Sequence, residues 1–90
     1  MAEHRVTIDR DTVADNPGDR QVEFAGEASG EVYDFALRYE VLEALTGQQA
    51  IEDPVFLFGQ HAARIELLAA HALGRNSDAE RVIVSGNDLD

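Results

Sequence analysis

Histidines are the first residues to consider for chemistry in this chain, because an imidazole can act as a general base or bind a metal ion. The sequence contains His4, His61 and His71. The last two lie in one stretch of helical spacing, which separates them by about 15 Å along a helix axis and turns them to different faces. They cannot share a metal ion, so we expect His61 at a boundary and His71 on the surface.

An aspartate-rich segment is the second candidate, because Ca²⁺ binds several carboxylate oxygens at short spacing. The segment contains Asp9, Asp11, Asp15 and Asp19. A calcium-binding loop of the EF-hand type also needs a glycine at its sixth position and a glutamate at its twelfth. Val13 and Pro17 interrupt the series instead. We therefore predict a solvated loop over residues 9–19 and no metal site.

Nucleophilic catalysis has no support in the sequence. Ser29, Ser77 and Ser85 lack the glycine elbow that presents a catalytic serine. The absence of cysteine excludes disulfides, thiol nucleophiles and cysteine zinc sites. We therefore expect a protein that is not an enzyme and has no cofactor.

The charge balance limits the classes of partner. The chain has 18 acidic and 7 basic residues, a formal net charge of −11, and every basic residue is arginine. An acidic surface repels phosphate backbones and anionic lipids, so we expect neither nucleic-acid nor membrane binding. A mimic of nucleic acid is one interpretation, but the acids are scattered, which favours a surface shaped by salt adaptation or genome composition.

Targeting signals give a further expectation. No stretch approaches the ~20 apolar residues that span a bilayer. Residues 1–30 lack the basic start and apolar run of a signal peptide. We expect a cytoplasmic protein.

The spacing of apolar residues predicts an α+β fold. Residues alternate between apolar and polar, or form a β-branched run, in four predicted strands at 5–8, 21–25, 31–39 and 81–85. Val41, Leu42 and Leu45 predict a short helix that ends at Gly47. Residues 26–30 read as a hairpin loop.

The longest predicted element is a helix from Pro54 to Gly74. Asp53 can cap its first turn, Pro54 suits the first helical position, and Gly74 suits a left-handed end. Apolar side chains recur every three or four residues and form one face: Phe58, Ala62, Ile65, Leu68, Ala69, Ala72 and Leu73. The opposite face carries Gln60, Arg64, Leu67 and His71. Gly59 weakens the helix near its start, where we allow for a kink.

The order of elements defines the predicted architecture. Three strands, two helices and a last strand indicate a small antiparallel sheet, packed on one face by the long helix and the short helix. The sequence does not determine which strand pairs with the last one. At 90 residues the chain suits a single domain over 1–90, with loose ends at 1–4 and 86–90.

The residues resemble a known family of short bacterial proteins, the domain of unknown function 1488. The resemblance rests on Val22-Glu23-Phe24, Phe35, Leu37, Glu40 to Leu45, Phe58, His61, Arg64-Ile65, Ala69, Val84-Ser85 and Asp88-Leu89. It covers roughly residues 20 to 90, and Tyr39 and Ala62 depart from the family pattern. The resemblance implies a compact α+β fold, a bacterial origin and no established activity, so it assigns no functional residues.

Two functional hypotheses remain open. The first is a non-enzymatic module that binds itself or another protein through apolar residues of the long helix. This surface would contain Val55, Phe56, Leu57 and Leu67, with the outer face of the sheet as an addition. The second is a site for an anionic small molecule between helix and sheet, with Tyr39, His61 and Arg64 as polar groups.

Overall fold

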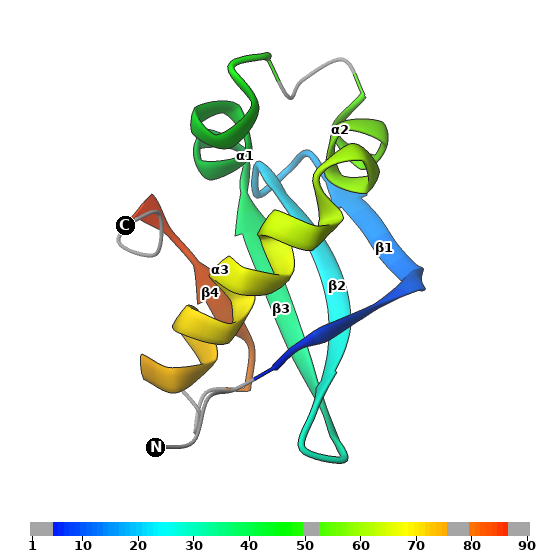
Figure 1. The fold of residues 1–90 in the computed structure, drawn as a ribbon. Coiled ribbons are helices and arrows are strands. Elements are labelled where there is room, and N and C mark those ends of the chain that lie inside the picture. Colours follow the sequence, from blue (N-terminus) through cyan, green and yellow to red (C-terminus); the bar gives the residue numbers. More distant parts are fainter. Residues whose placement is uncertain (1–4, 50–52, 76–79, 87–90) are drawn as a thin grey trace.

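Four strands and three helices make up the part of the chain that the computed structural model describes, residues 5–49, 53–75 and 80–86. The elements are β1 (Thr7–Asn16), β2 (Gln21–Ala28), β3 (Glu31–Arg38), α1 (Tyr39–Thr46), α2 (Pro54–Gln60), α3 (Ala62–Arg75) and β4 (Val82–Val84). The strands form one sheet in the order β1-β2-β3-β4, and the helices lie on the same side of it (Figure 1). The predicted α+β class is confirmed.

The sheet is mixed, whereas we predicted an antiparallel sheet and left the pairing of the last strand open. β1 pairs antiparallel with β2, and β2 pairs antiparallel with β3. β4 instead pairs parallel with β3, with Val82 opposite Phe35 and Val84 opposite Leu37. Three helices lie between β3 and β4 in the chain and carry it back along the sheet, as a parallel pair requires.

β1 is much longer than predicted. We expected a strand that stops at Ile8 and a loop over 9–19, but pairing with β2 continues to Asn16, and only residues 17–20 form the turn. A bulge separates two paired stretches, since Asp9 lies opposite Ala25 and Ala14 lies opposite Glu23. Aspartates are tolerated here because β1 is an edge strand with most of its side chains in solvent.

The predicted long helix is two helices. α2 ends at Gln60, and His61, with φ −119° and ψ 22°, separates it from α3. The His61 amide donates to the Phe58 carbonyl at 3.1 Å, and the His61 carbonyl accepts from the Ile65 amide at 3.0 Å. Gly59, which favours the helix less than alanine does, lies two residues before the break.

Two predicted helix boundaries are confirmed, the start of α2 and the end of α1. Asp53 accepts a hydrogen bond from the Phe56 amide at 3.2 Å, with Pro54 in the first turn. Gly47 adopts the left-handed conformation, with φ 74°, and closes α1 by donating to the Glu43 carbonyl. The predicted apolar face is also confirmed, because all seven of its residues are buried.

An aromatic cluster joins the sheet to the helices. The Phe24 ring of β2 stacks on the Phe35 ring of β3, with centroids 5.1 Å apart. Phe58 of α2 meets Phe24 edge to face at 4.9 Å. Such ring pairs add about 0.5–1.5 kcal/mol beyond the burial of their area.

Gly26 lies inside β2, opposite Ile8 and Tyr33, which corrects its predicted place in a hairpin loop. A Cβ at this position would lie 2.7 Å from Cγ1 of Val6 and 3.0 Å from Cε1 of Phe35. Only glycine therefore lets the core close over the strand here.

Gly26→Ala should lower the free energy of unfolding by about 1–3 kcal/mol, because the added methyl group overpacks the core. Urea denaturation measures the change. Gly59→Ala is the matched control: its Cβ meets nothing within 4 Å, and alanine favours a helix, so it should leave stability equal or higher. Equal losses in the two variants would contradict this account.

Candidate functional site

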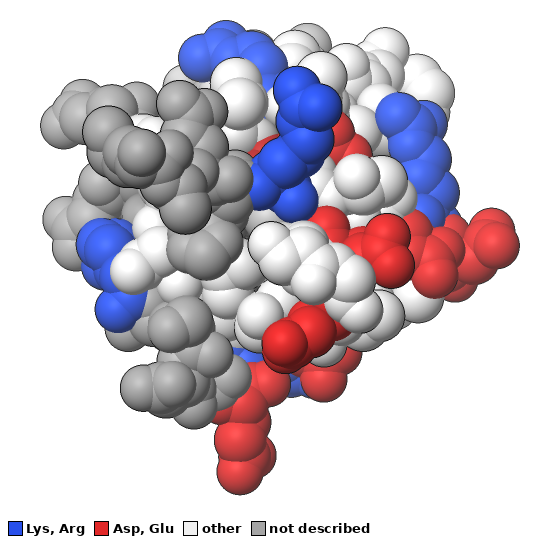
Figure 2. Space-filling model, turned by 60° about the horizontal axis from the view of Figure 1, so that its bottom comes forward, with Lys and Arg blue, Asp and Glu red and all other residues white. Residues whose placement is uncertain are grey.

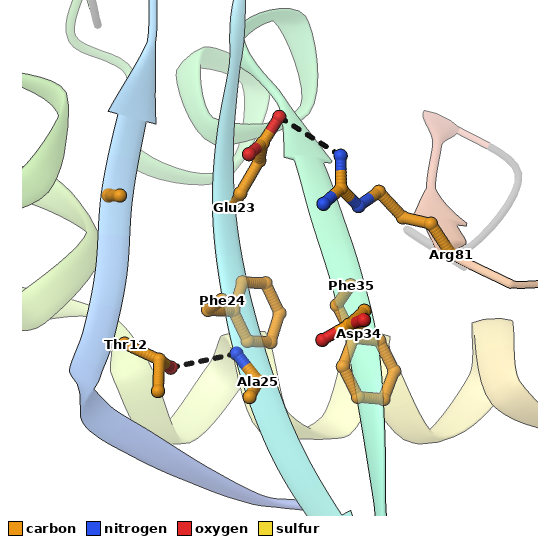
Figure 3. A pocket seen from close by; sticks show the side chains of 8 residues that line it. Thr12, Glu23, Phe24, Ala25, Asp34, Phe35 and Arg81 are labelled. Carbon is orange, nitrogen blue, oxygen red and sulfur yellow. Dashed lines mark hydrogen bonds and ion pairs between the residues drawn. The ribbon is translucent and has the colours of Figure 1, made fainter.

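A shallow cavity, here called the hollow, lies on the face of the sheet that the helices leave open. It has a volume of about 210 Å³ and is lined by Thr12, Ala14, Glu23, Phe24, Ala25, Asp34, Phe35 and Arg81. Figure 3 views it from the side opposite the helices, with β1, β2 and β3 running through the view. Ala14 and Ala25 contribute only methyl groups to the lining. The space between the longer side chains around them therefore stays open.

Thr12 holds the bulge of β1 against β2. Its hydroxyl donates to the Asp9 carbonyl at 2.6 Å and accepts from the Ala25 amide at 2.8 Å. The side chain therefore replaces the backbone partner that the bulge takes away from Ala25, and the sheet stays connected beneath the hollow.

Glu23 is the centre of a polar network at the end of the hollow that is uppermost in Figure 3. Its Oε2 accepts from Asn16 Nδ2 at 2.7 Å, from Gln21 Nε2 at 2.9 Å and from Arg81 Nη1 at 3.2 Å. The hydrogen bond from Asn16, then that from Gln21, hold the pKa of the Glu23 carboxyl below its usual 4.5, and Arg81 adds to them against partial desolvation. Glu23 is therefore a fixed anion at neutral pH.

Arg81 and Asp34 complete the charged rim. Arg81 precedes β4, and its guanidinium group turns toward Glu23, while the Asp34 carboxylate of β3 points toward β2 (Figure 3). In the described part of the chain, the Asp34 side chain is exposed and makes no hydrogen bond or ion pair. The hollow thus combines an ion pair with a solvent-exposed carboxylate.

The predicted apolar surface is present in part. Phe56 is 60% exposed, Val55 39% and Leu67 69%. Leu57 is only 5% exposed, so it belongs to the core and not to the surface that we predicted. Residues 54, 57 and 58 form the buried side of α2, and this leaves 55 and 56 as its outer side.

The three residues of the predicted anionic-ligand site do not come together in any described cavity. Tyr39 is buried, its hydroxyl donates to Asp15, and Arg20 lies over its ring. Burial, then the bond to Asp15, raise the pKa of Tyr39 to about 12. His61 is half-buried, the boundary position that we predicted, and Arg64 is exposed on α3. The geometry gives this hypothesis no support.

The hollow was missed in the sequence analysis. Glu23, Ala25 and Asp34 all fall on the outward side of alternating strands, which is a detectable signal. Thr12 and Arg81 carry no such signal, because one lies in a bulge and the other reaches the sheet through a parallel strand. Their position depends on pairing that the sequence leaves open.

Metal sites and membrane-spanning helices are both absent from the described residues. No group of three or more histidine, aspartate or glutamate side chains there is placed to hold a metal ion. Nor is any helix of that part long and apolar enough to cross a membrane. On the face shown in Figure 2, arginines lie apart from one another, and acidic side chains lie at the right, near the centre and at the bottom of the view.

Comparison with solved structures finds the same fold in a protein of unknown function from the DUF1488 family of Shewanella loihica PV-4. The TM-score is 0.71, with 19% sequence identity over 93% of this chain and 94% of that chain. The resemblance seen in the sequence is therefore confirmed at the level of the fold. No family model matches the sequence, and no curated protein is significantly similar to it.

Thr12→Val should speed hydrogen exchange of the Ala25 amide and lower stability by about 1 kcal/mol, because the amide loses its acceptor. Thr12→Ser keeps the hydroxyl and should exchange at the original rate. Native-state exchange followed by NMR measures both. An unchanged Ala25 rate in Thr12→Val would show that the hydroxyl does not hold the bulge.

The Glu23 network should make stability depend on pH. Because the folded pKa is lowered, its contribution is complete above the usual value of 4.5 and is lost as pH falls through the folded value. In an NMR titration of the Glu23 carboxyl carbon, Asn16→Ala should raise the pKa more than Arg81→Gln. The reverse order would mean that the ion pair dominates the network.

Proposed function

We propose that this protein is a non-catalytic, cytoplasmic module that binds another protein, or a second copy of itself, through the exposed first turn of α2. The observation that supports the proposal most is the exposure of Phe56, which leaves 60% of a large aromatic side chain in solvent. Aromatic side chains are enriched among the residues that dominate protein interfaces.

The first turn of α2 is held in place before any partner binds. Asp53 caps the helix at the Phe56 amide, and the buried Leu57 and Phe58 anchor the same turn to the core. Phe56 therefore projects from a fixed backbone, which lowers the entropic cost of association. Val55, 39% exposed, extends the apolar area beside it.

Phe56→Asp should abolish the assembly, because it places a charge in the apolar contact. The native mass of the protein purified from its own cells, measured at low and high salt, gives the result: a multiple of 9.9 kDa indicates self-association, and a co-purifying chain indicates a partner. The variant should return to 9.9 kDa.

Val32→Asp is the matched control, since Val32 is 70% exposed at the start of β3 and the change adds the same charge. It should keep the assembly. Loss of the assembly in both variants would point to net charge instead of the α2 contact. A 9.9 kDa monomer at both salt concentrations would contradict the proposal.

A further inference from the structure

We propose that the hollow binds the guanidinium group of an arginine side chain presented by a partner protein. The hollow lies on the face of the sheet opposite the helices, whereas Phe56 belongs to α2 (Figures 1 and 3). The two surfaces are separate, so this inference goes beyond the contact proposed for α2 and does not depend on it.

Charge is the first argument. The hollow is lined by two carboxylates, Glu23 and Asp34, and one guanidinium group, Arg81, which together leave one negative charge. Asp34 pairs with Ala25 across the strands, so Glu23 is its diagonal neighbour on the same face. Diagonal neighbours have Cα atoms about 7–8 Å apart. A cation in the hollow is therefore attracted mainly by Asp34, because Arg81 already pairs with Glu23.

The second argument is that the fold already accepts this chemical group at one end of the hollow. Nη1 of Arg81 lies 3.2 Å from Oε2 of Glu23. No such counter-charge accompanies Asp34 in the described part of the chain. A guanidinium group supplied by a partner would form an ion pair with Asp34, as Arg81 does with Glu23. Its planar, bidentate geometry matches a carboxylate.

Size is the third argument. A volume of about 210 Å³ corresponds to roughly seven water molecules at ~30 Å³ each. It falls below the ~300 Å³ at which pockets for drug-sized ligands begin. The space therefore suits the head of one side chain. The net charge of −11 would also draw a basic partner toward the molecule.

The test uses a capped tripeptide, acetyl-Gly-Arg-Gly-amide, titrated onto the isotope-labelled protein at low salt and followed by NMR. Saturable shifts of the Ala25 and Asp34 amides are expected, with the weak affinity of a single exposed ion pair. Asp34→Asn should weaken binding by about threefold or more, as loss of an exposed ion pair allows. Glu27→Gln removes the same charge from an exposed residue outside the hollow and should leave the Kd unchanged.

Arg81→Gln should have the opposite effect. It removes the internal guanidinium group and leaves two uncompensated carboxylates, so the peptide should bind about threefold tighter. Arg64→Gln, a change of the same charge on the exposed side of α3, should not alter the Kd. This gain cannot arise from damage to the fold, which would only weaken binding.

Several results would overturn the proposal. These are the absence of shifts at the hollow, equal effects of Asp34→Asn and Glu27→Gln, and equal binding of the lysine tripeptide or free spermidine, which would indicate a general cation effect. Phe56→Asp should bind the arginine peptide with an unchanged Kd. This keeps failure of the α2 contact distinct from failure of the hollow.

Discussion

The contact among three aromatic rings is the constraint on which the rest of the structure depends. Phe24 and Phe35 stack across neighbouring strands, and Phe58 meets Phe24 from α2, so one cluster ties the sheet to the helical layer. Gly26 lets Val6 and Phe35 approach the strand closely enough for the cluster to be enclosed. α3 begins directly after the break that follows α2. The position at which Phe58 packs therefore also determines where α3 crosses the sheet.

The same cluster determines where the hollow lies. Successive side chains of a strand point to opposite faces, so Glu23 and Ala25, next to Phe24, and Asp34, next to Phe35, must face away from the helices. The hollow is therefore directly behind the packed rings, and both phenylalanines contribute to its lining. A change in the packing of the rings would therefore also shift the charged side chains of the hollow, because the same strands carry both.

The two proposed binding surfaces differ in chemistry and in the elements that support them. The first turn of α2 presents an apolar side chain that its own buried neighbours hold in place. The hollow presents charge on a floor of small side chains, and the Glu23 network fixes that charge at neutral pH. A partner that used both would have to reach around the domain, so each surface is better suited to a separate contact.

Local patterns in the sequence predicted the class of fold, the apolar face of α2 and α3, the cap at Asp53 and the outward position of Leu67, because these depend on neighbours within a turn or a strand. It missed the length of β1, the break at His61, the burial of Leu57 and the parallel pairing of β4. The first and the last of these depend on contacts between separate segments, Thr12 with Ala25 and β4 with β3. The hollow belongs to the second group. Local spacing placed Glu23 and Asp34 on outward positions, but only tertiary pairing brought Arg81 beside Glu23, because that contact joins residues 58 positions apart in the chain.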